Sequence, residues 1–593
     1  MTTGVAAPLP EAGVRPGSRG PLFGVHLEQL VATQVAAVLV VVGAIDSIFA
    51  RTAGVTIATA ILTVTWLRLR GRWTFEWLGI ALRYSGRRRV VSLDPDHGAV
   101  LGFVAPGLQV TPANQADDPA AVLSDGFGLT TILELGDPAA LFAGEATPLP
   151  ALGGLRPASS PDQPTARMQL LLTVSPAPAS SAGMSPAANS YRHLSESSTL
   201  GHGRAMLAVR VLRAEGWSDE ELRRSLAGLV RKLVRQLSAA PARPLGEAAA
   251  RRAITDLAHV GTDGPARENW AGLDLGGLVQ ATFRCQATQG NALSGTLISR
   301  LLTLPAAATT VAFSAGVRPV ESAETTVRLA AADPNTLAVA SGALRKLLAT
   351  HGARVRRLDG EHLSGLAATL PLGGSTASAA TRALLPARLD LPVNSAGLML
   401  GRNRHGAPLL VRLFRPEATR VLLVGGVRCA QLMVLRAMAL GAQVVVQTSR
   451  PDAWEPFVRG SGVPGESATV VPPGRSIDTP PGSALRPLLT VIDLGPVAAD
   501  RRPGAAWQAT LIVRDDFGSG DIDTATRSDL VVLQPLHPAE ATLLGGALSL
   551  GETAQWLTRI RPDMVGVVNR RAVRWATLAP TTIEHSLVGI PTR

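Results

Sequence analysis

A glycine turn between an apolar strand and a helix is the part of this sequence that comes nearest to a phosphate-binding site. Residues 420–425 read RVLLVG, an apolar strand ending in glycine, and residues 427–440 have the spacing of a helix. A loop of the form GxxxxGK[ST] binds phosphate through glycines that expose backbone N–H groups, a lysine, and a hydroxyl group that holds Mg²⁺. Gly425 and Gly426 supply the first of these parts.

The lysine and the hydroxyl group are absent. Counted from Gly425, the closing positions of the motif hold Ala430, Gln431 and Leu432. Asp493 ends a later apolar strand, which is where a magnesium-associated acid would lie. We therefore predict a degenerate loop that hydrolyses no nucleotide, with no catalytic residue and no cofactor.

Other candidate chemistry is sparse. Asp521 and Asp523 form a DxD pair, which resembles the metal-nucleotide site of glycosyltransferases, but acidic pairs in Gly/Ser-rich loops are more often turn or cap residues. The histidines form no HExxH motif, and Cys285 and Cys429 have no ligand spacing, so we predict no metal site. A membrane-tethered nucleotide-binding or glycosyltransferase-like enzyme remains the alternative function.

The strands that would position the loop predict an α/β domain over residues 395–593. Its further apolar strands are expected at 443–448, 488–494, 509–516 and 529–535. Runs of this kind, apolar throughout, are typical of parallel strands covered on both faces. Their order along the chain resembles an FtsK-type P-loop fold in which the loop is degenerate.

The composition indicates that part of the chain lies in a membrane. Of its 593 residues 46% are hydrophobic and 17% are charged, with a mean hydropathy of +0.21. Residues 30–45 and 52–67 are two uncharged apolar runs, which predict a transmembrane helical hairpin over 30–67 after a disordered tail, 1–29. A cleaved signal peptide is the alternative for the first run.

Arginines flank this hairpin and set its predicted orientation. Arg15 and Arg19 precede it and seven arginines follow within 66–89, so both termini and the large domains are expected in the cytoplasm of a plasma-membrane protein. We predict a basic, aromatic helix over 68–90 that contacts anionic lipid headgroups rather than nucleic acid, or clamps a neighbouring protein. The predicted interface residues are Trp66, Arg68, Arg70, Arg72, Trp73, Trp77, Arg83, Tyr84, Arg87, Arg88 and Arg89.

The middle of the chain predicts a second α/β domain, over residues 91–373. Residues 205–211 alternate as a strand, and Ser218 with Glu221 forms a capping box at the start of a helix. Residues 143–203 are rich in Ala, Pro, Ser and Gly and are expected to be mostly loop. We place a linker at 374–394. The predicted fold class is therefore α/β cytosolic domains attached to an N-terminal two-helix transmembrane hairpin.

Several segments, taken in order, resemble the EccE family of type VII (ESX-like) secretion systems. The resemblance covers residues 30–374 and is carried by WLRLRGRWTFEWLGIALRYSGRRR (66–89), VLSDGFGLTTILEL (122–135), the pair Ser190–Tyr191 and LDGEHLSGLAATLPLGG (358–374). It implies a non-enzymatic actinobacterial membrane subunit. The partners that it implies are EccB-, EccC- and EccD-like proteins, the secretion ATPase among them.

Overall fold

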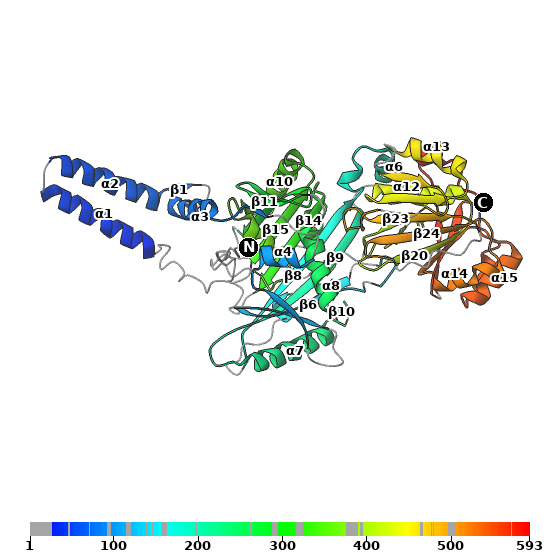
Figure 1. Cartoon of the computed structure of the whole chain (residues 1–593), viewed down its shortest axis with the longest axis horizontal. Coiled ribbons are helices and arrows are strands. Elements are labelled where there is room, and N and C mark those ends of the chain that lie inside the picture. The colour runs from blue at the N-terminus through cyan, green and yellow to red at the C-terminus, as the bar shows by residue number, and fades with distance from the viewer. Residues whose placement is uncertain are drawn as a thin grey trace, which may run out of the picture.

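The computed structural model describes most of the chain from residue 27 onward. The residues outside the description are 1–26, 46–47, 70–71, 92–96, 114–119, 138, 145–146, 151, 156–162, 196–198, 239, 261–263, 288–294, 316–323, 375–388, 392–394, 463–466, 476, 478, 496–503 and 571. The predicted tail 1–29 and linker 374–394 therefore fall largely outside it. Figure 1 shows the described parts in a row: a pair of helices, a first sheet and a second sheet. The fold class is mixed α/β.

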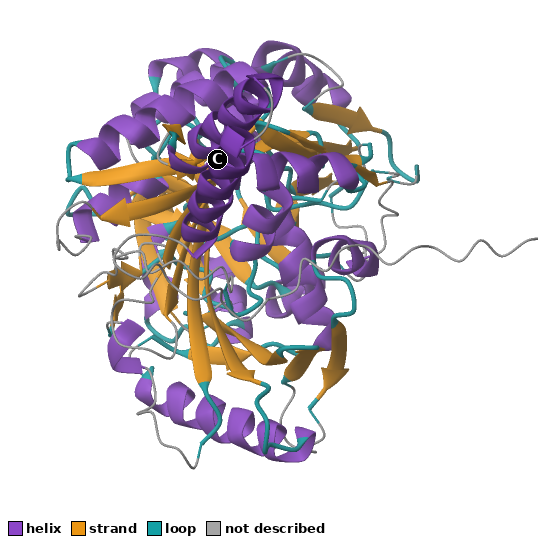
Figure 2. Cartoon of the chain, turned by 90° about the vertical axis from the view of Figure 1, so that its left-hand side faces the viewer, coloured by secondary structure: helices purple, strands orange, loops and turns teal. Residues whose placement is uncertain are grey.

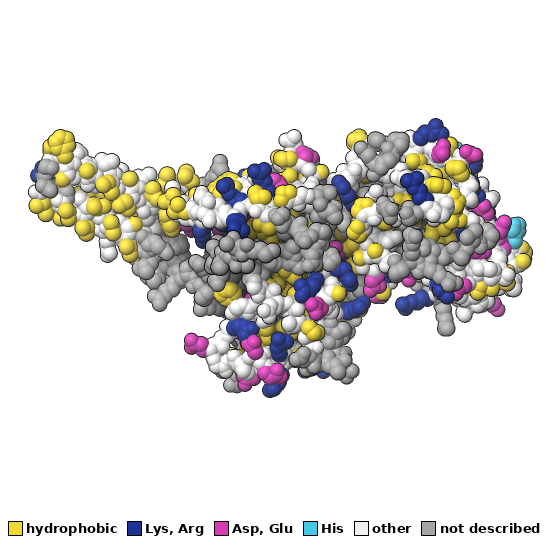
Figure 3. All heavy atoms as spheres, in the orientation of Figure 1, with side chains coloured by type: hydrophobic (Ala, Val, Ile, Leu, Met, Phe, Trp, Pro, Cys, Tyr) yellow, Lys and Arg dark blue, Asp and Glu magenta, His cyan; other side chains and the backbone are white. Residues whose placement is uncertain are grey.

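Two helices, α1 (Leu27–Ile45) and α2 (Ile48–Trp66), lie side by side and project from the rest of the molecule (Figure 1). Small residues make the contact, since Ala36, Gly54 and Ala58 are buried between the helices. Gln29 Nε2 also donates to Thr65 O at 3.2 Å. The outward side chains are apolar, as the yellow surface of the pair in Figure 3 shows.

Within the described residues, α2 is the one helix that is long and apolar enough to cross a membrane, with a mean hydropathy of 1.5. The apolar stretch of α1 is shorter, Gln29–Val42. This finding supports one candidate span near the N-terminus. The predicted hairpin of two spans goes further than this and is taken up below as a proposal.

The segment after α2 differs from the predicted helix over 68–90. Strands β1 (Arg68–Leu69) and β2 (Arg72–Trp73) form a small ladder, α3 covers only Thr74–Gly86, and β3 (Val90–Val91) joins the first sheet. The helix begins at Thr74 because Glu76 caps it by accepting the Trp73 N–H at 3.1 Å. It ends at Gly86 because Arg87 is extended.

The first sheet has thirteen strands, and its strands pair antiparallel. The order from one edge to the other is β3-β11-β12-β13-β15-β14-β8-β9-β6-β5-β4, with β10 beside β6 and β16 beside β13. Its strands are β4 (Gln109–Pro112), β5 (Ala121–Asp125), β6 (Gly128–Leu135), β8 (Ala166–Ala177), β9 (Thr199–Leu212), β10 (Ala242–Pro244), β11 (Ala266–Asn269), β12 (Gly272–Leu275), β13 (Leu278–Ala287), β14 (Ala308–Ala315), β15 (Glu324–Ala331) and β16 (Ala353–Arg357).

This sheet consists of two halves with the same topology. Each half has a hairpin (β5–β6 or β12–β13), two further strands (β8–β9 or β14–β15), a helix, a short strand added to the hairpin, and a second helix. The helices are α7 (Asp219–Gln236) and α8 (Glu247–Ala258) in one half, and α10 (Pro334–Ala349) and α11 (His362–Ala368) in the other. The halves join through β8 and β14, where the Thr173 and Thr310 hydroxyl groups lie 3.0 Å apart.

The second sheet has ten strands in the order β19-β18-β27-β26-β25-β20-β24-β23-β21-β22, and the six from β25 to β22 are parallel. They are β20 (Thr419–Val424), β21 (Gln443–Thr448), β22 (Ala468–Val471), β23 (Leu488–Asp493), β24 (Gln508–Arg514) and β25 (Leu530–Leu533); the antiparallel strands are β18 (Leu398–Arg402), β19 (Pro408–Val411), β26 (Met564–Asn569) and β27 (Ala572–Thr577). The predicted strands match these bounds within two residues. Figure 2 shows helices along the upper and lower borders of the whole molecule, with strands between them.

One helix of the middle region packs into the core of the second sheet's domain. Residues 143–203, expected to be mostly loop, contain the long strand β8 and the helix α6 (Pro186–Ser195). Ala187, Tyr191 and Leu194 of α6 are buried with residues of α12 (Val427–Ala439) and α17 (Thr582–Val588). The loop prediction was wrong because small Ala and Ser side chains also suit a tightly packed helix. The two sheets are thus held together by shared core side chains.

Candidate functional site

The carboxyl edge of the parallel strands is where this fold class binds ligands, and the predicted loop lies there. Strand β20 leads into the turn Gly425–Gly426, and its neighbours β25 and β24 lead into Gln534 and Asp515. Asp493 is the last residue of β23, next to β24. The parallel topology therefore brings the predicted loop and the predicted acid to one edge.

The glycine turn is packed against the protein's own atoms. Gly425 N–H donates to Arg514 O and Gly426 N–H to Gln534 Oε1, both at 2.8 Å. A Cβ on Gly425 would lie 2.4 Å from Gln534 Oε1, and one on Gly426 would lie 2.9 Å from Thr592 O. Gly426 needs glycine because it approaches a backbone oxygen, whereas a Cβ on Gly425 would force the Gln534 side chain to shift; no phosphate has to be invoked.

A closing segment, residues 589–593, covers this turn. Gln534 Nε2 donates to Pro591 O at 2.5 Å, so the amide group of Gln534 joins the turn to the closing segment. Arg593 forms a two-pronged ion pair with Glu540, donates to Pro535 O and Asp515 O at 2.8 Å, and reaches Asp516 at 3.2 Å. The space in front of the turn is filled by the chain itself.

Arg593 also fixes the protonation state of Glu540. Burial by itself raises the pKa of this carboxyl group, but the Arg593 guanidinium and the Phe517 N–H outweigh it and hold the pKa below the ordinary value. Glu540 is therefore ionised, and it also caps α15 (Pro538–Ala547) by accepting the His537 N–H at 2.8 Å. The closing segment is anchored by a charged, partly buried bond rather than by loose surface contact.

The three positions that would complete the loop motif are all buried in α12. Ala430 and Leu432 belong to the hydrophobic core, and Gln431 Nε2 donates to Ala453 O at 2.7 Å. None of the three side chains carries a positive charge or a hydroxyl group. These three positions therefore form the packed start of a helix rather than a phosphate-binding loop.

Asp493 is bound on both oxygens by the protein. Its Oδ2 accepts hydrogen bonds from Thr448 Oγ1, Arg450 Nε and Trp454 Nε1 at 2.8–2.9 Å, and its Oδ1 accepts from Arg450 Nη2 at 2.8 Å. Arg450 also bridges to Asp515 at 2.6 Å, and these hydrogen bonds raise the pKa of Arg450 further. Asp493 is 3% exposed, so it serves as an internal counter-ion.

The DxD pair does not form a site. Asp521 is buried and pairs with Arg514 Nε at 2.7 Å, whereas Asp523 is exposed on α14 (Ile522–Arg527) and pairs with Arg527 at 2.8 Å. The described residues contain no group of three His, Cys, Asp or Glu side chains that could hold a metal ion. Cys285 and Cys429 are buried, and burial raises the pKa of each thiol to about 12.

The residues predicted at the membrane interface divide into two groups. Four of them bind the first sheet's domain, where Arg72 pairs with Glu361 and Arg87 with Glu268, each at 2.6 Å. Trp77 and Tyr84 contact the Trp270 ring, with centroids 6.0 and 5.2 Å apart. These four side chains therefore contact the protein itself, whereas Arg70 lies outside the described residues.

The other predicted interface residues remain accessible. Trp66, Arg68, Arg83, Arg88 and Arg89 are exposed, and Trp73 is half-buried beneath Arg68. Two leucines of α3 were missed: Leu78 and Leu82, 53% and 66% exposed on the face opposite the docked one. Their spacing of four residues, offset from Trp77 and Tyr84, is the signal that could have identified them.

Comparisons with known proteins identify no family. No protein-family description and no curated protein matches the chain. Among solved structures, the DNA-packaging ATPase B204 of Sulfolobus turreted icosahedral virus covers 27% of this chain and 98% of its own, at 10% identity and a TM-score of 0.20. The genome-packaging NTPase B204 of Sulfolobus turreted icosahedral virus 2, solved with ATP-gammaS, gives the same values except 97% of its own chain. These likenesses are distant and at this TM-score carry no argument about function.

Proposed function

We propose that this protein is a non-enzymatic, membrane-anchored structural subunit of a type VII protein secretion complex. The observation that supports a structural rather than an enzymatic role is the closed carboxyl edge of the second sheet. The glycine turn is bonded to Gln534, Asp493 to Arg450, and the space in front is filled by the closing segment. The protein therefore acts through assembly.

In this proposal α1 and α2 both span the plasma membrane, and the large domains lie in the cytoplasm. The exposed valines and isoleucines of both helices support contact with lipid, and the arginines that follow α2 support a cytoplasmic position for the domains. Leu78 and Leu82 of α3 then lie at headgroup depth, with Arg83 beside them, and bind anionic lipid.

The connection between α2 and the first sheet would fix the domains relative to the membrane. α3 is held to the sheet by the ion pairs of Arg72 and Arg87 and by the Trp270 ring. Gly360, with φ +69°, lets the chain pass close to this ring, since a Cβ there would lie 2.7 Å from Trp270. Such a stiff connection suits a subunit that holds its neighbours in place.

The partners in this proposal are EccB-, EccC- and EccD-like subunits, as the EccE resemblance of residues 66–89 and 358–374 implies. The chain makes no contact with nucleic acid in this scheme. Its cytosolic domains lie beside the secretion ATPase rather than providing the hydrolysis themselves.

The test is gentle detergent extraction of the tagged full-length protein from its host, followed by native electrophoresis and mass spectrometry. We expect a large assembly that contains the three kinds of subunit, and we expect deletion of residues 30–67 to abolish it. Recovery of the wild-type protein alone, as a small detergent-bound species, would contradict the proposal.

A further inference from the structure

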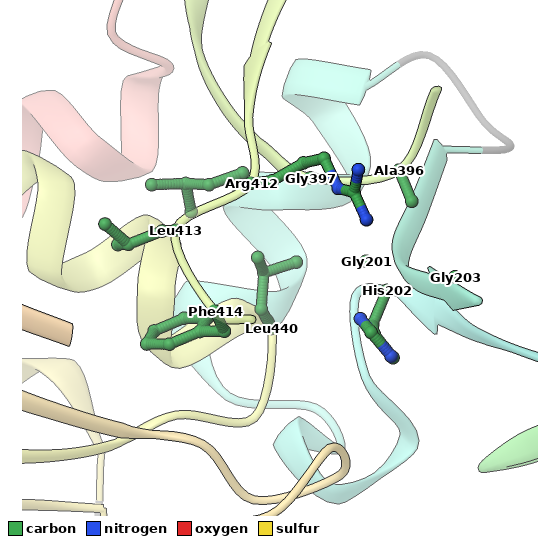
Figure 4. Close-up of a pocket in the computed structure, with 10 residues that line it drawn as sticks. Gly201, His202, Gly203, Ala396, Gly397, Arg412, Leu413, Phe414 and Leu440 are labelled. Atoms are coloured by element: carbon green, nitrogen blue, oxygen red, sulfur yellow. The ribbon is translucent and has the colours of Figure 1, made fainter. Parts of the chain in front are cut away.

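Two cavities at the junction of the two sheets are too small for a ligand. Each measures about 10 Å³, which is room for about one water molecule. Figure 4 shows one of them, where Arg412 and His202 stand among glycines and aliphatic side chains. These cavities therefore leave the outer surface of the molecule as the place where a partner can bind.

An exposed row of threonines runs along α2. Its members are Thr52, Thr56, Thr59 and Thr63, and all of these side chains are exposed. They follow one another at intervals of four, three and four residues, which places them on one face of a helix. The row is about 16 Å long, since each residue of a helix adds about 1.5 Å. We call it the threonine face.

The threonine face points away from α1. Gly54 and Ala58 are buried in the contact between the two helices. Thr56 lies two residues from each of them, which is about half a turn of a helix. Figure 1 shows the helix pair projecting from both sheets, so the described parts of the chain leave this face uncovered.

The other outward side chains of the helix pair are bulky and apolar. On α2, Val55 and Leu62 flank the threonine face on one side and Ile57 on the other, and all three are exposed. On α1, Val38 and Val42 are both 60% exposed. Lipid tails suit such side chains, whereas contacts between membrane helices are enriched in small and hydroxyl-bearing residues. The threonine face therefore has the composition of a helix contact and not of a lipid-facing surface.

The hydroxyl groups of this face are bonded within their own helix and keep a free acceptor. Each of them donates to the carbonyl oxygen four residues earlier, at 2.7–3.2 Å. No other side chain of the described residues donates to these hydroxyl oxygens. A hydroxyl oxygen in this state can still accept a hydrogen bond from a neighbouring helix.

We propose that the threonine face binds the same face of a second copy of this chain within the membrane. Two copies inserted in the same orientation have parallel α2 helices, and in a parallel symmetric pair each residue of such a row meets its own counterpart. A hydroxyl group donates as well as accepts, so threonine is complementary to threonine across the symmetry axis. This inference rests on the proposed membrane span of α2.

The test is disulfide formation between single cysteines of the full-length chain in the membranes of its host. Thr59→Cys probes the threonine face, and Ile57→Cys is the control on another side of α2 at nearly the same depth. We expect a covalent dimer to form at least about ten times faster from Thr59→Cys, because a disulfide needs Cβ atoms about 4 Å apart. The wild type, in which Cys285 and Cys429 are buried, gives the background.

Equal rates for the two variants would overturn the proposal. An adduct between Thr59→Cys and a protein of another mass, in place of the dimer, would also overturn it, because the occupant would then be a different subunit. Alkaline carbonate extraction of the same membranes tests the anchor separately. A chain that stays in the membrane without dimerising contradicts the dimer alone, whereas a chain that is extracted contradicts the membrane anchor and the dimer together.

The hydroxyl groups can be tested without changing the shape of the face. Thr56→Val and Thr63→Val replace each hydroxyl group by a methyl group of similar size. We expect the two changes together to raise the dissociation constant of the dimer about tenfold, measured by energy transfer between labelled copies in lipid vesicles. The control Ile57→Val should leave the constant unchanged. An unchanged constant in the double variant would contradict pairing through the hydroxyl groups.

Discussion

Gln534 joins the glycine turn to the closing segment through one amide group. Its Oε1 accepts the Gly426 N–H, and its Nε2 donates to Pro591 O. The position that would receive a phosphate is therefore occupied by a side-chain oxygen of the protein. This relationship supports the structural role that we propose for the second sheet.

Removing Asp493 should cost stability rather than nucleotide affinity. Asp493→Ala leaves the buried Trp454 indole and Thr448 hydroxyl without their acceptor and frees Arg450, so we expect a loss of about 2–3 kcal/mol in the free energy of unfolding. Urea unfolding measures it. The exposed control Asp523→Ala should change stability by less than about 0.5 kcal/mol. A loss of nucleotide binding in Asp493→Ala without loss of stability would contradict this role.

The junction of the two sheets depends on Trp507. Its indole N–H donates to Asp256 at 3.1 Å, and its ring packs on His202. Trp507→Phe keeps most of the ring packing but removes the donor, so we expect about 1 kcal/mol of destabilisation and faster protease cleavage between the domains. The control is Trp556→Phe, on a side chain that is 60% exposed. Equal unfolding free energies and equal cleavage rates in the two variants would show that the hydrogen bond from Trp507 to Asp256 does not secure the junction.

The attachment of α3 depends on Trp270. Trp270→Ala removes the ring on which Trp77 and Tyr84 pack. We expect the free energy that holds α3 against the first sheet to fall by about 2–3 kcal/mol. Trypsin should then cleave the arginine-rich segment 68–89 several times faster, while Trp556→Ala, as control, leaves the rate unchanged. Protection of that segment in Trp270→Ala would mean that the ion pairs alone hold α3.

Acid should destabilise the first domain through its buried histidines. Burial, with help from Arg328 and Arg357, lowers the pKa of His259 and His362 from 6.5 to about 3. Below about pH 6.5 these histidines bind protons in the unfolded chain but not in the folded one. Their contribution to the free energy of unfolding is therefore fully present above that pH. It falls by about 1.4 kcal/mol per pH unit for each histidine between pH 6.5 and 3.

The pH dependence can be assigned by substitution. His362→Gln should reduce the loss of unfolding free energy per pH unit by about one histidine's share. Denaturant unfolding at a series of pH values gives the slope. An unchanged slope in His362→Gln would contradict the buried, neutral state of this residue.

The sequence predicted the second sheet better than the first, for physical reasons. Parallel strands such as 420–425 and 488–494 are continuous apolar runs, which are visible without knowledge of their neighbours. The repeat within the first sheet was not visible, because its halves share strand order rather than side chains. Strand β10, with three residues, is defined by its pairing with β6 and not by its own composition.

The candidate site shows the same division. The absence of a lysine and a hydroxyl group could be read from Gln431 and Leu432. The role of the closing segment could not be predicted from the sequence, because its contact with Gly426 joins residues that are far apart along the chain. The docking of Arg72 and Arg87 was not predicted for a related reason: their partners Glu361 and Glu268 lie far along the chain, so the arginines were expected to contact lipid headgroups or a neighbouring protein.

The most direct test of the account is a titration of the purified full-length protein with a fluorescent ATP analogue in the presence of Mg²⁺. A closed sheet edge predicts no saturable binding up to millimolar nucleotide, for the wild type and for Gln534→Leu alike, and no phosphate release. Saturable, Mg²⁺-dependent binding to the wild type that Asp493→Ala abolishes would contradict the central claim that this sheet is a scaffold.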